Sequence, residues 1–116
     1  QEGIKSAEVF EMLKQVVDIS KKTLIYVASP GLLQAVYQAV RNYPDYMSLF
    51  PGTLGLIGFD DQGWTRMTTP AISAIITPAY EVGVRAMEEL IDLLEGRRVE
   101  GEVVFKNIVK WRETTL

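Results

Sequence analysis

Two stretches in which an apolar run passes directly into a helix-start signal constrain the fold of this chain most. They are residues 23–30 (TLIYVASP) and residues 72–78 (ISAIITP). In each stretch a capping residue, Ser29 or Thr77, precedes a proline at the first helical position, where the missing N–H costs no hydrogen bond. Both stretches therefore predict a strand followed at once by a helix, which is the repeating unit of an α/β protein.

The remaining apolar patterns supply further helices and strands. Apolar spacing of three and four residues predicts helices over 6–19, over 30–41 and from 77 to near Gly96, and apolar runs predict strands over 53–59 and 103–111. Residues 42–52 predict a loop that covers its own apolar side chains, and residues 112–116 predict a frayed, charged tail. The order of elements predicts an α/β fold, with a mostly parallel sheet, helices on both faces, and the strand at 23–28 buried on both sides.

The composition excludes several kinds of protein. The chain has no Cys and no His, which removes disulfides, thiolate nucleophiles, imidazole bases and the usual ligands of zinc. We therefore expect neither enzymatic activity nor a metal or cofactor. The formal net charge of −3 gives no overall attraction to phosphate backbones, so we expect this segment to have little affinity for DNA. No apolar run reaches the roughly 18 residues of a membrane span, which predicts a soluble protein.

The second half of the chain contains an ordered set of motifs. The set comprises LGLIGFDD at 54–61, Trp64, TPAISAI at 69–75, Pro78, Glu81, Gly83 and KWRET at 110–114. This set resembles the C-terminal signature of the LacI/GalR family of transcription regulators. A strand that ends in Gly-Phe-Asp-Asp and a last strand that runs into Arg-Glu are typical of that family. The resemblance extends from about Ser6 to Thr115. It departs from the family at Ser29, where members commonly have Asn, and at Thr77, where Gln often stands.

The resemblance implies part of a sensor domain of the type 1 periplasmic-binding-protein kind. Residues 1–76 would form the C-terminal lobe, 77–100 a crossover helix towards the other lobe, and 101–116 the final strand and tail. Such a domain would bind a sugar, sugar acid or similar polyol, form a homodimer in the cytoplasm, and act on operator DNA through an N-terminal helix-turn-helix. Because the chain starts at Gln1 without Met, we interpret it as a piece of something longer. The alternative is an exported solute-binding protein of an uptake transporter, which shares this fold.

Three side chains are the candidate effector ligands. Asp60 follows the strand at 53–59, and open α/β sheets bind their ligands at the carboxyl ends of parallel strands. The resemblance implies that Asp60 contacts effector hydroxyls, with turn capping as the alternative. Trp64 would either stack on a sugar ring or pack over the sheet edge, and Ser29 would either offer its hydroxyl to the cleft or cap the next helix.

Asp61 differs from its neighbour in the predicted role. We expect it to be structural and to bond the N–H groups of the turn. Adjacent residues at a strand end point in opposite directions, so Asp60 and Asp61 do not face a common bond as the two acids of a glycosidase do.

Two apolar helix faces predict self-association. The helix at 30–41 has a wider apolar stripe than one sheet face needs, and the matching helix in the family lies at a subunit interface, with core packing as the alternative. The later helix places on one face Val84, Met87, Leu90, Ile91 and Leu94. The resemblance implies that this face packs on the other lobe. We therefore expect a dimer in which it docks on residues 32–40 of a second copy, the alternative being a monomer with the helix folded onto its own sheet.

Overall fold

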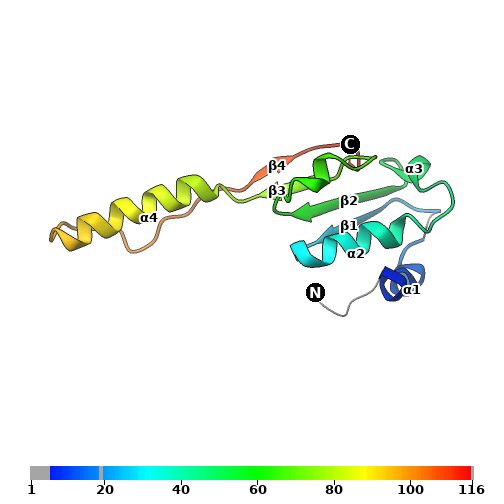
Figure 1. Ribbon diagram of the computed structural model, residues 1–116, viewed down its shortest axis with the longest axis horizontal. Coiled ribbons are helices and arrows are strands. Elements are labelled where there is room, and N and C mark those ends of the chain that lie inside the picture. The colour runs from blue at the N-terminus through cyan, green and yellow to red at the C-terminus, as the bar shows by residue number, and fades with distance from the viewer. Residues whose placement is uncertain (1–5, 19, 116) are drawn as a thin grey trace. The chain divides into compact units, whose positions relative to one another are not determined.

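The computed structural model describes residues 6–18 and 20–115, which fall into two compact units (Figure 1). The first unit comprises Gln1–Ile76 with Val109–Leu116, and the second comprises Thr77–Ile108. The first contains α1 (Ser6–Val16), β1 (Thr23–Val27), α2 (Pro30–Val40), α3 (Tyr46–Leu49), β2 (Leu54–Phe59), the 3₁₀ turn η1 (Trp64–Arg66) and β3 (Ser73–Ile76). The second contains α4 (Ala79–Leu94), and β4 (Ile108–Lys110) spans the point where the chain returns to the first unit.

The strands form one sheet in the order β1-β2-β3-β4 (Figure 1). β1 pairs with β2 in parallel, with Val27 opposite Gly58, and β2 pairs with β3 in parallel, with Ile57 opposite Ser73. The predicted α/β class with a mostly parallel sheet is confirmed. The last strand is shorter than the predicted 103–111, because residues 103–107 belong to the second unit, where no described strand is available to pair with them.

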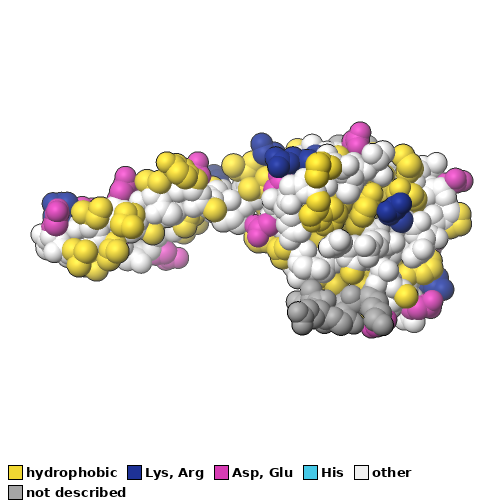
Figure 2. Space-filling model, viewed as in Figure 1, with side chains coloured by type: hydrophobic (Ala, Val, Ile, Leu, Met, Phe, Trp, Pro, Cys, Tyr) yellow, Lys and Arg dark blue, Asp and Glu magenta, His cyan; other side chains and the backbone are white. Residues whose placement is uncertain are grey.

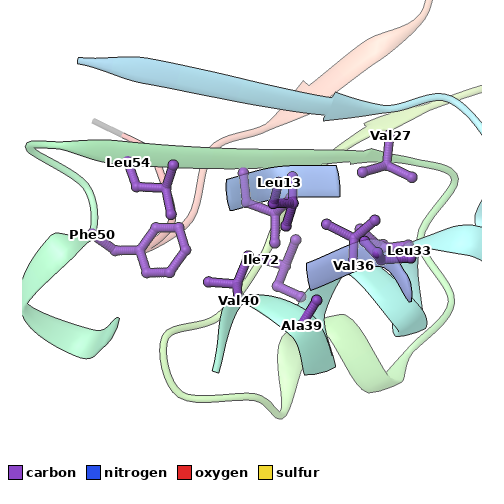
Figure 3. Close-up of a cluster of buried hydrophobic side chains, with 11 residues drawn as sticks. Leu13, Val27, Leu33, Val36, Ala39, Val40, Phe50, Leu54 and Ile72 are labelled. Atoms are coloured by element: carbon purple, nitrogen blue, oxygen red, sulfur yellow. The ribbon is translucent and has the colours of Figure 1, made fainter. Parts of the chain in front are cut away.

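The hydrophobic core of the first unit lies between the sheet and the helices α1 and α2, as Figure 3 shows. The core cluster contains Val9, Leu13, Val27, Leu33, Val36, Ala39, Val40, Phe50, Leu54, Leu56 and Ile72. The apolar stripe of α2 is thus core packing. Leu33, Val36 and Val40 are covered by their own unit, so these three side chains are not available for the predicted docking of a second copy on residues 32–40.

The loop at 42–52 contains a short helix that was not predicted. α3 follows Asp45, whose φ of 51° lies in the left-handed region. The prediction that the loop covers its own apolar side chains holds in part, because Phe50 is buried in the core cluster whereas Met47 is 52% exposed.

The opposite face of β1 is open to solvent. Leu24 is 63% exposed and Tyr26 is 51% exposed, so the prediction that this strand is buried on both sides is wrong for this chain. An apolar run of this kind needs a covering layer on each face, and the core cluster covers only the face that carries Val27. A groove of about 390 Å³ on the exposed face is lined in part by Leu24, Gly55 and Trp111.

The second unit is built on α4. Its helix begins one residue later than predicted, because the ψ of 70° at Pro78 is not helical and makes this residue the N-cap in place of Thr77. The predicted end is confirmed: Gly96 has a φ of 80°, and the Arg97 N–H donates to the Asp92 carbonyl oxygen at 2.8 Å, as in a Schellman motif.

The apolar face of α4 remains uncovered. No residue of α4 is buried, and Figure 2 shows hydrophobic side chains spread along the helix. Within its own unit, α4 therefore has no covering partner. Over residues 6–18 and 20–115, no helix is both long enough and apolar enough to cross a membrane.

Candidate functional site

Two of the three candidate effector ligands lie at the carboxyl edge of the sheet. Val27 is opposite Gly58 in the parallel pair β1 and β2, so Ser29 and Asp60, each two residues further on, follow neighbouring strands at the same edge. The backbone topology therefore places a hydroxyl and a carboxylate where an open α/β sheet offers its ligand crevice.

Asp60 has an unusual backbone conformation, and its carboxylate has no partner among the described residues. Its φ is 67°, in the left-handed region that Asp tolerates better than most residues, and its N–H donates to the Ile75 carbonyl oxygen at 2.7 Å. Its carboxylate makes no hydrogen bond or ion pair within the described part of the chain, and the side chain is half-buried. A half-buried carboxylate without an internal partner is free to accept hydrogen bonds from a ligand.

Ser29 is the N-cap residue of α2, but its hydroxyl makes no capping hydrogen bond. The Ser29 carbonyl oxygen instead accepts the N–H groups of Leu32 and Leu33, at 3.1 and 3.2 Å. Ser29 thus occupies the predicted N-cap position, but its side chain does not cap the helix. The Ser29 hydroxyl remains available at the same edge as Asp60.

Trp64 begins the 3₁₀ turn η1 and packs against α2. Its ring packs at 6.0 Å between centroids from Tyr37, and its indole N–H donates to the Gln62 Oε1 at 2.7 Å. These contacts are those of the packing alternative.

Asp61 is held by Arg112, a residue of the predicted frayed tail. The Arg112 Nη2 donates to the Asp61 Oδ2 at 2.8 Å, and the Thr65 hydroxyl donates to the Asp61 Oδ1 at 2.9 Å. The side chains of Asp61 and Arg112 are each only 15% exposed. The structural role of Asp61 agrees with the prediction, but its donors are side chains and not the N–H groups of the turn.

The ionisation of Asp61 reflects these partners. Burial raises the pKa of the Asp61 carboxyl, but the hydrogen bonds from Arg112 and Thr65, together with the charges of Arg112 and Arg66, outweigh burial and hold this pKa below its usual value. Asp61 is therefore a carboxylate at neutral pH.

Residues 112–115 are fixed to the sheet, so the prediction of a frayed tail is wrong for these residues, and Leu116 lies outside the described residues. The Arg112 N–H donates to the Ser73 hydroxyl at 2.8 Å, and the Thr114 N–H donates to the Ala71 carbonyl oxygen at 3.0 Å. Arg112 thus contacts Ser73, and Thr114, two residues later, contacts Ala71, two residues earlier. The tail therefore runs antiparallel to the start of β3. Thr114 is fully buried, and its hydroxyl donates to the Leu56 carbonyl oxygen at 2.6 Å. The charge of Arg112 and Glu113 suggested exposure, although the Arg-Glu motif was the available signal for a fixed tail.

The part of the chain that the structure describes contains no group of three or more acidic residues arranged to hold a metal ion. The arrangement at the carboxyl edge is thus a carboxylate and a hydroxyl on a rigid sheet, which suits hydrogen bonding to a polar ligand.

Comparison with known proteins identifies the class to which this sheet and edge belong. The family model described as "Periplasmic binding protein-like domain" matches residues 2–115. Catabolite control protein A of Priestia megaterium is 25% identical over 114 residues, which are 97% of this chain and 32% of that protein. The chain therefore spans about a third of the length of this relative.

Two solved structures share the fold. A dimeric Lac repressor matches with a TM-score of 0.73 at 20% identity, over 95% of this chain and 38% of that one. A periplasmic binding protein/LacI transcriptional regulator from Alkaliphilus metalliredigens, complexed with D-xylulofuranose, matches with a TM-score of 0.68 at 21% identity, over 95% of this chain and 41% of that one.

The chain belongs to the family of periplasmic-binding-protein-like domains. Its relatives include the HTH-type transcriptional repressor CytR of Escherichia coli, which is 39% identical over 49 residues, 42% of this chain and 14% of that protein. The resemblance to the LacI/GalR family is confirmed.

Proposed function

We propose that this chain is the effector-sensing part of a LacI-type transcription repressor. The observation that carries the proposal is the Asp60 carboxylate, which has no hydrogen-bond or ion-pair partner within residues 6–18 and 20–115. It lies at the same carboxyl edge of the parallel sheet as Ser29, whose hydroxyl makes no capping hydrogen bond. The relatives that cover nearly the whole chain are transcription regulators and not enzymes, which supports a binding role.

The proposed effector is a sugar, a sugar acid or a similar polyol. Neighbouring hydroxyls of a sugar are paired donors, and a carboxylate can accept both in charge-assisted hydrogen bonds. Ser29 adds one donor and acceptor at the same edge. The complex of a related regulator with D-xylulofuranose supports this class of ligand. The proposed role of Trp64 is to stack on the ring of the effector.

The rest of the proposal concerns the whole regulator. Residues 1–76 would belong to the C-terminal lobe, 77–100 would cross to the other lobe, and 101–116 would return. The regulator would form a homodimer, as the related dimeric Lac repressor does, and would act in the cytoplasm on operator DNA through an N-terminal helix-turn-helix outside this chain. Effector binding between lobes would shift their closure and so change operator affinity.

The test is the substitution Asp60→Asn in the full-length protein, with Asp45→Asn as its matched control. Both acids have left-handed φ values, 67° and 51°, and Asn tolerates this conformation, so neither substitution strains the backbone. Calorimetry would use D-xylulose first, then other pentoses, hexoses and sugar acids. Asp60→Asn should weaken binding by about 1–3 kcal/mol, and Asp45→Asn should leave it unchanged. Equal affinity of wild type and Asp60→Asn would contradict the assignment.

The exported solute-binding protein remains the second candidate, because it would use the same sheet edge. The sequence that precedes this chain distinguishes the two, since a helix-turn-helix supports the repressor and a secretory signal peptide supports the transporter component.

A further inference from the structure

The turn that carries Asp60 has an uncommon backbone conformation. Few non-glycine residues adopt the left-handed region, although Asp does so more often than most. The φ of 67° at Asp60 is held by contacts on both sides of the residue. On one side, the hydrogen bond from the Asp60 N–H to the Ile75 carbonyl oxygen fixes the residue to β3. On the other side, the next residue, Asp61, is fixed by its side chain.

The group that fixes Asp61 comes from a distant part of the chain. Arg112 lies 51 residues further on, just after the chain returns to the first unit at Val109. Its guanidinium donates to the Asp61 Oδ2 at 2.8 Å and to the Ile72 carbonyl oxygen at 2.7 Å. One planar group thus ties the returning segment to both the Asp61 turn and the start of β3, a geometry that the fork of an arginine allows and a lysine does not.

We propose that Arg112 is a positioning residue for effector recognition: by clamping Asp61, it holds Asp60 in the left-handed conformation that presents its carboxylate at the carboxyl edge. Arg112 does not touch the ligand in this arrangement. The inference rests on the proposed function, because it gives the clamp its role in binding. It also makes the segment that returns from the second unit a part of the effector turn's support.

Arg66 supplies the matched control. Its Nε lies 4.0 Å from the Asp61 Oδ2, but its side chain is 64% exposed, and it makes no hydrogen bond to the carboxylate within residues 6–18 and 20–115. Replacing Arg66 with Gln therefore removes a positive charge beside Asp61 without removing a donor that holds it. Exposed ion pairs at this distance contribute little to the stability of a protein.

The experiment compares Arg112→Gln, Asp61→Asn and Arg66→Gln in the full-length protein. The first readout is hydrogen exchange of the Asp60 amide in ligand-free protein, and the second is calorimetry with the sugar panel that begins with D-xylulose. We expect Arg112→Gln and Asp61→Asn each to accelerate Asp60 exchange and to weaken binding about tenfold, the double variant to be no weaker than the worse single variant, and Arg66→Gln to match wild type.

A purely structural Arg112 would give a different result. It would lower the unfolding temperature while leaving both Asp60 exchange and sugar affinity unchanged in the folded variants, and this result would overturn the proposal. If Arg112→Gln does not fold, Arg112→Lys, which keeps the charge but cannot span both acceptors, takes its place with the same expected direction. A wild-type protein that binds no sugar of the panel would overturn the proposed function, and the exchange of Asp60 would then decide the clamp by itself.

Discussion

The two units of this chain use similar amphipathic helices in opposite ways. In the first unit, α2 buries most of its apolar stripe, and Leu33 is 0% exposed. In the second unit, α4 has an apolar stripe of the same kind, yet Leu90 is 49% exposed and no residue of the helix is buried. Helical spacing of apolar residues therefore predicts which face will be buried but not what covers it. The first unit contains the partner of its helix, and α4 requires a partner from outside its own unit.

The largest expected effect comes from truncating one leucine in each unit. Leu33→Ala in the 116-residue chain should cost about 2–5 kcal/mol, because it leaves a cavity in a closed core. Leu90→Ala should cost less than about 0.5 kcal/mol, because an exposed side chain leaves no cavity. Urea unfolding followed by far-ultraviolet circular dichroism measures both.

The concentration dependence of this pair sharpens the comparison. If α4 finds a second copy, the cost of Leu90→Ala should rise with protein concentration, since association stabilises the covered state. A cost for Leu90→Ala that equals the cost for Leu33→Ala at every concentration would contradict the exposed α4.

A smaller effect is expected from adding one methyl group at Gly58, where β2 packs closely against α2. A Cβ at Gly58 would lie 2.5 Å from the Cδ2 of Leu33, and Leu33 is confined by the core. Gly58→Ala should therefore destabilise the chain by about 1–3 kcal/mol through overpacking. Gly52→Ala is the control, because a Cβ at Gly52 meets no atom within 4 Å. Equal unfolding midpoints for the two variants would show that α2 shifts freely over β2.

The sequence was sufficient for most of the first unit because local signals and the core agree there. Cap residues followed by proline located the start of α2, and the apolar runs located β1, β2 and β3. The exposure of Leu24 and Tyr26 was not predictable, because an apolar run shows that a strand needs two covering layers and not whether the chain supplies both. The predicted length of β4 was wrong for a related reason, since a strand forms only where a neighbouring strand can pair with it.

The candidate site was predictable only where its residues follow strands. Ser29 and Asp60 share an edge because β1 and β2 are parallel, which strand order alone implies. The contact of Trp64 with Tyr37 depends on the path of a loop, and the contact of Arg112 with Asp61 joins residues 51 positions apart. The spacing of apolar residues along the sequence predicts neither of these two contacts. A buried acid beside a strand end nevertheless requires a cationic or hydrogen-bonding partner, so the sequence implies that such a partner exists without identifying it.

The smallest expected effect tests whether the middle of α4 is open. A Cβ at Gly83 meets no atom within 4 Å, and Ala is favoured over Gly inside a helix by about 0.5–1 kcal/mol. Gly83→Ala should therefore slow hydrogen exchange of the α4 amides in the 116-residue chain. Gly101→Ala, which also adds a methyl group in open space but lies outside the helix, should leave these rates unchanged. In the full-length protein, faster exchange in Gly83→Ala would show that another surface packs against this glycine, whereas faster exchange in the 116-residue chain would contradict an open α4.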